Sequence, residues 1–291
     1  MSIRFGIGTG ADLDPADLPG LVDRLEADGV DSLWFSELVY SRAVDPFVGM
    51  AYAASRTEKL KVGTSVAILP GRHPVLVAKQ LLSLAALAPR RVLPVFGLQA
   101  GNPKERELFP VNGRRGEVFD ESLRLLRAVL ADDDIDFAGD HFDVTGAAVR
   151  QGHSGSVDVW LGGRVPAAYR RIGALGDGWL GSFVTPAEAA AGVAEINAAA
   201  AASGRQIDDD HFGITILVAD GADPDELTAR AGSRRPEVDA RELVATGWPA
   251  LHRMIDDYIQ AGLSKFVIIP ASGGMTSFVD RFVDELLPRQ T

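Results

Sequence analysis

The sequence contains no cysteine and has few basic residues. Without thiols the chain has no disulfide framework, no thiolate zinc site and no iron–sulfur cluster, and a reducing compartment is permitted. Lysine and arginine total 29 against 40 aspartates and glutamates, which gives a net charge of −11. DNA, RNA and anionic membranes are bound by clustered cations. We therefore expect no nucleic acid and no membrane among its partners.

Long apolar runs and metal-ligand clusters are also missing. No run approaches the roughly 20 apolar residues of a membrane span. The segment Met1–Arg4 lacks the basic-then-apolar layout of a signal peptide, so we expect a cytoplasmic protein. The five histidines form no pair with metal-ligand spacing, and the acidic stretch Asp132–Asp136 lacks the glycine of a calcium loop. The sequence thus predicts no metal site.

What the sequence does contain is a regular alternation of two kinds of segment. Short β-branched runs predict strands, and amphipathic stretches with apolar residues at i, i+3, i+4 and i+7 predict helices. The expected strands are Ile3–Gly8, Ser32–Ser36, Leu60–Ile68, Arg91–Leu98, Val157–Leu161, Trp179–Gly181, Phe212–Ala219 and Ser264–Pro270. The expected helices are Pro15–Asp28, Asp45–Arg56, Pro74–Ala88, Arg114–Ala131, Pro166–Leu175, Pro186–Ser203, Trp248–Ala261 and Thr276–Leu287.

Eight strand–helix units in 291 residues predict an α/β protein with a single (β/α)8 barrel over residues 1–291. The continuous apolar strands are typical of parallel sheets covered on both faces. A doubly wound open sheet has the same alternation and remains the alternative. Two stretches interrupt the rhythm, at about 132–156 and 221–247. The first contains a hairpin signal at Phe137–Val144, and the second follows a strand, where a lid over the site would lie.

Three segments at strand ends carry candidate chemistry, because the active sites of such barrels lie at the carboxyl ends of the strands. Glu37 follows the second strand, where a carboxylate orients a ligand or moves a proton; its alternative is a solvated charge or an ion pair with Arg42. Thr64 and Ser65 are small polar residues in an apolar strand, so they either face a ligand or satisfy barrel backbone. In Gly162-Gly163-Arg164, a glycine turn and an arginine precede a helix, which predicts a phosphate cradle. The alternative there is a tight turn that needs glycine for steric reasons.

The glycines of Gly6–Gly10 suggest a dinucleotide fold, but the spacing disfavours it. A pyrophosphate is bound where a helix begins directly after the glycines. Here Ala11–Pro15 intervenes with two carboxylates. We expect instead that these glycines let the backbone approach a flat ligand.

Six segments in order resemble the luciferase-like monooxygenase superfamily, and specifically its F420-dependent oxidoreductase branch. The resemblance spans nearly the whole chain. The matching segments are Asp31–Glu37, Arg56–Val66, Arg72–Gln80, Gly113–Glu121, Val159–Arg164 and Gly176–Trp179.

This resemblance implies a luciferase-like barrel with insertions and with a flavin ring system in its mouth. It implies a bulge and a cis Ser65–Val66 bond pressing on the ring of coenzyme F420, so Ser65 and Val66 are expected cofactor contacts. Gly162, Gly163 and Arg164 match the phosphate-binding turn. Gly101 and Asn102, after the fourth strand, complete the expected contacts: Ser65, Val66, Gly101, Asn102, Gly162, Gly163 and Arg164. A homodimer is also implied.

The sequence departs from family members that oxidise alcohols, which carry Ser-Asp-His after the second strand. Here the residues are Ser36-Glu37-Leu38. Leu38 cannot be a base, so hydride delivery to an activated alkene or imine fits better, with Glu37 as the catalytic residue that holds the ring or gives a proton. The alternatives are a flavin mononucleotide (FMN) monooxygenase supplied by a separate reductase, and a non-catalytic flavin-binding barrel.

Overall fold

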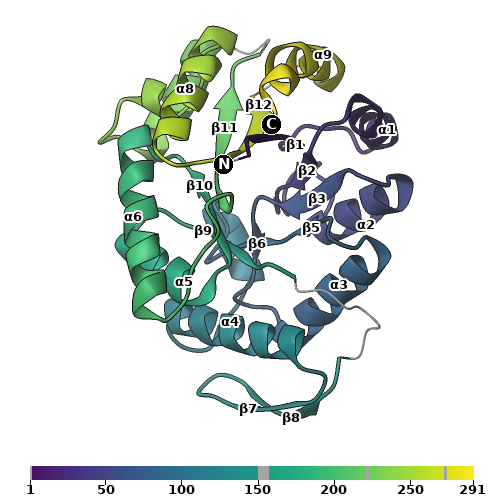
Figure 1. Cartoon of the computed structure of the whole chain (residues 1–291), viewed down its shortest axis with the longest axis vertical. Helices are drawn as coiled ribbons and strands as arrows, with labels where there is room; N and C mark the ends of the chain where they lie inside the picture. Colours follow the sequence, from purple (N-terminus) through teal and green to yellow (C-terminus); the bar gives the residue numbers. More distant parts are fainter. Residues whose placement is uncertain (1, 150–156, 221–222, 272–273) are drawn as a thin grey trace.

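A closed ring of parallel strands forms the centre of the computed structural model, which describes residues 2–149, 157–220, 223–271 and 274–291. Figure 1 shows the strands of this ring in the middle of the molecule, with the helices arranged around them. The strands of the ring are β1 (Arg4–Gly8), β2 (Ser32–Phe35), β3 (Lys61–Thr64), β4 (Ala67–Ile68), β5 (Val92–Leu93), β6 (Val95–Gly97), β9 (Trp160–Gly162), β10 (Gly178–Ser182), β11 (Phe212–Val218) and β12 (Lys265–Pro270).

The ring is closed although two of its strands are each interrupted once. β3 pairs with β2 and β5, while β4 pairs with β6, which pairs with β9. Counting β3 with β4 and β5 with β6 turns ten segments into eight strands, and β12 pairs with both β11 and β1. All these pairings are parallel. The predicted (β/α)8 barrel is confirmed, and the open sheet was the wrong alternative.

The two interruptions lie next to each other, after Thr64 and at Pro94. Proline has no N–H to give to a strand ladder. The Thr64 hydroxyl replaces the missing pairing: it donates to the Val95 carbonyl over 2.6 Å and accepts from the Val95 N–H over 2.8 Å. Thr64 therefore satisfies barrel backbone, as its alternative interpretation predicted.

The helices α1 (Leu18–Asp28), α2 (Pro46–Arg56), α3 (Pro74–Leu87), α4 (Arg115–Ala131), α5 (Pro166–Leu175), α6 (Pro186–Ala202), α8 (Trp248–Gln260) and α9 (Met275–Leu286) surround the strands. Seven of the eight differ from the predicted ranges by one to three residues at an end. None of the described helices has both the length and the apolar character that a membrane crossing requires.

Two apolar layers hold the barrel together. The larger packs the strands against the surrounding helices. The smaller fills the space inside the ring and consists of Trp34, Val95, Trp160, Leu180, Val267 and Ile269. Gly6 leaves room for it, since a Cβ there would lie 2.6 Å from the Trp34 indole nitrogen. The expectation that Gly6 serves ligand approach was therefore wrong, although Gly10 does line the cavity described below.

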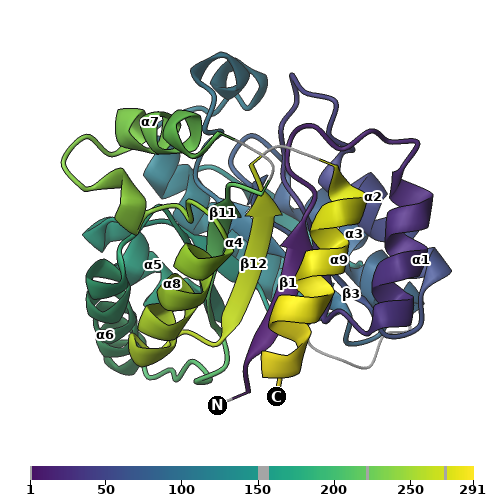
Figure 2. The same ribbon diagram turned by 90° about the horizontal axis from the view of Figure 1, so that it is seen from above.

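Both predicted interruptions contain structure outside the barrel sheet. The hairpin of β7 (Ile135–Ala138) and β8 (Asp143–Ala147) confirms the turn signal, and residues 150–156 lie outside the described part. The second stretch contains α7 (Pro224–Arg234) and the short helix η2 (Ala240–Glu242), with 221–222 outside the described residues. In Figure 2, α7 lies above the arrowheads of β11 and β12, at the end of the barrel opposite both termini. The boundaries of the two insertions stay a prediction.

Candidate active site

A cavity of about 870 Å³ opens at the carboxyl ends of the strands. Glu37, Ser65, Gly101 and Gly163, which follow four different strands, all line it, as expected for residues at the carboxyl ends of barrel strands. Hydroxyl groups and apolar side chains form its deeper wall. These are Ser36, Ser65, Val66, Leu180, Ser182, Thr215, Leu217 and Ile269.

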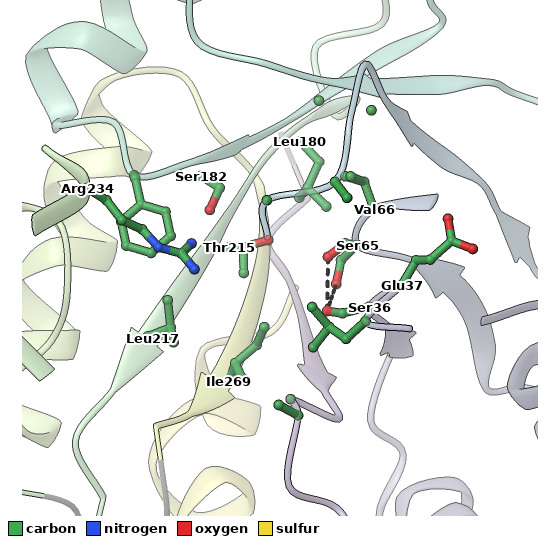
Figure 3. A pocket seen from close by; sticks show the side chains of 18 of the residues that line it. Ser36, Glu37, Ser65, Val66, Leu180, Ser182, Thr215, Leu217, Arg234 and Ile269 are labelled. Atoms are coloured by element: carbon green, nitrogen blue, oxygen red, sulfur yellow. Dashed lines mark hydrogen bonds between the residues drawn. The ribbon is translucent and has the colours of Figure 1, made fainter. Parts of the chain in front are cut away.

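The segment between β3 and β4 forms one wall of the cavity. The Ser65–Val66 peptide bond is cis, as the resemblance implied. The Ser65 N–H donates to the Phe35 carbonyl over 2.8 Å, and the Ser36 hydroxyl donates to the Ser65 carbonyl over 3.0 Å. The hydroxyls of Ser36 and Ser65 lie 3.3 Å apart, drawn as a dashed line in Figure 3. The end of β2 thus holds this wall in place.

Glu37 clamps the same segment from outside. Its Oε2 accepts from the Ile68 N–H over 2.7 Å and from Arg72 Nη1 over 2.8 Å, while its Oε1 accepts from Arg72 Nη2. Its own N–H donates to the Val66 carbonyl over 3.3 Å. The carboxylate is buried and points away from Ser36 and Ser65 (Figure 3). Such bidentate, charge-assisted contacts fix geometry strongly.

The ion pair of Glu37 is not the one that the sequence suggested. Arg42 lies five residues away but pairs with Asp14 at the surface. Arg72 comes instead from the loop after β4, and its guanidinium also donates to the Ile68 carbonyl over 2.6 Å. It lies against the ring of Phe109, 5.1 Å from the centroid. Arg72 begins one of the six segments that resemble the family, Arg72–Gln80, but the sequence did not indicate that Glu37 is its ion-pair partner.

Two glycines on neighbouring strands, Gly97 of β6 and Gly162 of β9, leave room for the side chain of Val66. A Cβ at Gly97 would lie 2.7 Å from Val66 Cγ2, and one at Gly162 would lie 3.2 Å from Val66 Cγ1. Real Cβ atoms do not approach so closely as at Gly97. The width of the cavity beside Val66 therefore depends on the absence of a side chain there.

We expect Gly97→Ala to push Val66, at a cost of about 1–3 kcal/mol of folding stability as is usual for overpacking. Cofactor binding should weaken as well, because Val66 is part of the cavity wall. Fluorescence titration with the cofactor measures this. The double variant Gly97→Ala/Val66→Ala should recover most of the loss, because it removes the colliding methyl group. Gly20→Ala is the control, since its added methyl meets no atom within 4 Å. Equal affinities of wild type and Gly97→Ala would contradict this interpretation.

The turn Gly162-Gly163-Arg164 lines the cavity beside α5. Gly163 has φ +140°, and a Cβ there would lie 2.5 Å from Ala168 Cβ, so the turn needs glycine for steric reasons. The indole of Trp179 donates to the Gly163 carbonyl over 2.9 Å. Within the described chain no side chain caps α5. Pro166 has no N–H and the Ala168 N–H donates to the Val165 carbonyl over 2.8 Å, so the Ala167 N–H is the first-turn amide left to meet an anion beside Arg164. The steric interpretation is therefore confirmed for Gly163, and the phosphate interpretation stays a prediction.

The remaining predicted contacts are placed less uniformly. Gly101 lines the cavity. The Asn102 side chain accepts from the Lys104 N–H over 3.1 Å and caps the short helix η1 (Pro103–Leu108); it is not among the described residues that line the cavity. Sequence reasoning missed Ser182 and Thr215, whose hydroxyls lie in short apolar strands. It also missed Arg230 and Arg234, which belong to an unpredicted helix.

One cluster elsewhere has metal-ligand groups. Ligand atoms of Asp208, Asp210 and His211 lie within 4.8 Å of one another. They precede β11, at the barrel end opposite the cavity, and the two aspartates are exposed. Exposed acidic groups without further evidence give no site.

Comparisons with known proteins give one family and several relatives. The family model described as luciferase-like monooxygenase matches residues 1–265. An uncharacterized protein of Mycobacterium tuberculosis is 34% identical over 141 residues, a match that spans only 47% of this chain and 47% of that relative. An F420-dependent glucose-6-phosphate dehydrogenase of Nocardia farcinica is 25% identical over 94% of both chains.

Solved structures share the fold. An F420-dependent secondary alcohol dehydrogenase in complex with an F420–acetone adduct gives a TM-score of 0.82 at 17% identity, over 98% of both chains. A coenzyme F420-dependent tetrahydromethanopterin reductase of Methanopyrus kandleri gives 0.80 at 15% identity, over the full length of both.

Proposed function

We propose that this chain, which belongs to the luciferase-like monooxygenase family, is an oxidoreductase that uses coenzyme F420 to transfer a hydride to or from a small organic substrate. One observation carries the proposal: a single cavity brings the Ser65–Val66 wall and the Gly162–Arg164 turn together at the carboxyl ends of the strands. A relative named for F420 dependence aligns with 94% of the chain.

The residues present fit such a cofactor. The cavity has the size of a cofactor site. Ser65 and Val66 form a wall for a ring system, with Gly101 at the same rim, and Gly162, Gly163 and Arg164 form an anion site for a phosphate. When bound, the deazaflavin supplies or accepts the hydride. The protein positions the reacting groups and keeps water away.

Glu37 acts in this proposal as a positioning residue. Both of its carboxylate oxygens already accept hydrogen bonds from Arg72 and the Ile68 amide, so it holds the wall that faces the ring. The hydroxyls of Ser36 and Ser65, or water, are then left to hold or move a proton. Leu38, which also lines the cavity, is no base, and this favours reduction of an activated double bond over oxidation of an alcohol.

The decisive experiment is titration of the purified protein with F420 and, separately, with FMN, followed by absorption and fluorescence. We expect F420 to bind at least tenfold more tightly. Re-oxidation of reduced F420 by a panel of enones and aldehydes then tests catalysis. Tight binding of FMN alone would favour the monooxygenase alternative. Cofactor binding without any turnover on the panel would favour a non-catalytic barrel.

The phosphate turn has its own test. We expect Arg164→Ala to weaken F420 binding by about 1–3 kcal/mol, because one charge-assisted contact to the phosphate is lost. Arg170→Ala, at an exposed arginine of the following helix α5, should leave the affinity unchanged. Unchanged F420 affinity in Arg164→Ala would remove this residue from the site.

We also propose a cytoplasmic homodimer. Val48 of α2 and Leu76 of α3 are exposed over 61% and 67%, in the first turns of neighbouring helices. Burying such side chains against a second copy is favourable. Light scattering should give the mass of a dimer, and Leu76→Glu should reduce it to that of a monomer. A monomeric wild type would contradict the proposal.

A further inference from the structure

One face of α7 forms part of the cavity. Leu227, Arg230, Ala231 and Arg234 follow the i, i+3, i+4, i+7 spacing of a helix face, and all four line the cavity. Leu227 and Ala231 are buried, and they fix the rotation of the helix. Arg230 and Arg234 must therefore face the cavity. We call these two residues the α7 arginine pair.

The carboxylates around α7 do not neutralise this pair. The neighbouring Arg235 is buried and forms ion pairs with both Glu188, over 2.7 Å, and Glu237. These two carboxylates are therefore already paired. Among the described residues no carboxylate forms an ion pair with Arg230 or Arg234. The chain has 40 acidic and 29 basic side chains, so most arginines would be expected to have a carboxylate partner. Two arginines without such a partner on one cavity wall therefore call for another explanation.

Arg234 is held in a fixed direction. Its guanidinium lies over the ring of Phe183, 5.1 Å from the centroid, a cation–π arrangement. Phe183 has φ +53°, an uncommon conformation for a phenylalanine, which places its ring at this point. In Figure 3, Arg234 extends into the cavity from the side opposite Ser65 and Val66.

The pair carries an electrostatic cost that an anion would relieve. Burial, followed by the charges of Arg230 and Arg164, lowers the pKa of Arg234 from its ordinary value. An arginine still remains protonated at neutral pH. Three like charges kept close together around open space are typical of a site for a carboxylate or phosphate.

We propose that the α7 arginine pair binds an anionic group, a carboxylate or a phosphate, of the substrate. The proposal rests on the proposed function, which assigns the wall at Ser65 and Val66 and the turn at Arg164 to the cofactor. The wall across the cavity then belongs to the substrate. The substrate class is accordingly an acid or phosphate ester with a reducible double bond. An acidic extension of the cofactor has the same chemistry and is the other source of such a group.

Isothermal titration with inorganic phosphate and with maleate tests the pair directly. We expect both anions to bind to the protein saturated with F420, in which the turn at Arg164 is occupied, and to cofactor-free Arg164→Ala protein, in which that turn has lost its arginine. In Arg230→Gln/Arg234→Gln their affinity should fall about 10- to 100-fold, the effect of lost charge-assisted contacts. Arg253→Gln, at an exposed arginine of α8, is the control. The F420 affinity of the double variant should stay within threefold of wild type.

Two outcomes would overturn the proposal. Anion affinity that is unchanged in the double variant would show that the pair is not an anion site. If F420 displaces phosphate, and the double variant loses F420 affinity, the pair serves the cofactor rather than the substrate. A failure of the proposed function can be told apart from these two outcomes. If the protein does not bind F420 at all, the affinities for phosphate and maleate can still be measured on the cofactor-free protein and its variants.

Discussion

Asp31→Asn is expected to lower the free energy of unfolding by about 3–5 kcal/mol, the usual effect of removing one partner of a buried ion pair. Asp31 precedes β2, at the barrel end away from the cavity. Its carboxylate accepts from Lys265 over 2.8 Å and from Lys61 over 2.9 Å. The side chains of Asp31 and Lys265 are each only 7% exposed. The substitution leaves the Lys265 ammonium buried without its counter-charge.

Urea unfolding measures the loss, and two further variants isolate its cause. Asp31→Asn/Lys265→Met should recover much of it, because an apolar side chain replaces the stranded charge. Asp23→Asn breaks a surface pair with Arg56 and should cost less than about 1 kcal/mol. An Asp31→Asn protein no less stable than the Asp23→Asn protein would show that the pair contributes little.

The same residue predicts a pH dependence. Burial alone would raise the pKa of Asp31, but the charges of Lys265 and Lys61 outweigh it and lower the pKa from 3.8 to about 2. A carboxyl whose pKa is lower in the folded state gives stability above its unfolded pKa and loses it as the pH falls. The stability advantage of wild type over Asp31→Asn should therefore shrink between about pH 4 and pH 2. An advantage that stays constant across this range would contradict the assignment.

The architecture was predictable because periodicity and turn signals agreed along the chain. Continuous apolar strands alternating with amphipathic helices indicate a parallel α/β sheet. The eight strand–helix units favoured a barrel over an open sheet, which the alternation alone does not exclude. What the pattern could not show is where a strand breaks. The segment 60–68 reads as one apolar run, yet it divides at Ser65 and Val66, and 91–98 divides at Pro94. Pro94 could be seen in the sequence. The hydroxyl of Thr64, however, bonds to the backbone of Val95 on another strand, and a pattern read along the chain does not show contacts between strands.

The site was predictable only in part, for a similar reason. Residues directly at strand ends, such as Glu37 and Ser65, were found because topology alone places them at the rim. Partners across loops were not, since Arg72 lies 35 residues from Glu37 and no local pattern links them. The helix α7 was missed because charged residues hide its apolar positions. The signals for its start were present in the sequence. The Asp223 side chain caps the helix by accepting a hydrogen bond from the Asp225 N–H, and Pro224 follows as the first helical residue.

For Glu37→Gln we expect two large effects and one small one. The unfolding free energy should fall by about 3 kcal/mol, because Arg72 loses the counter-charge of a largely buried pair. F420 affinity should fall about 10- to 100-fold, since the wall at Ser65 and Val66 loses its clamp. Turnover at saturating F420 should stay within about tenfold of wild type, because general acid–base help is usually worth 10²–10⁴-fold and the carboxylate has no free oxygen to give it.

Matched variants separate the clamp from general damage. Arg72→Lys keeps the charge but loses the two-pronged contact, so it should reproduce the loss of affinity in milder form. Arg42→Gln breaks only the exposed pair with Asp14, and it should change neither stability nor affinity noticeably. The opposite pattern in Glu37→Gln, full F420 affinity with turnover reduced 10²-fold or more, would make Glu37 the proton donor. Since stability, affinity and turnover are measured separately, the two roles left open by the sequence give different results in the same set of proteins.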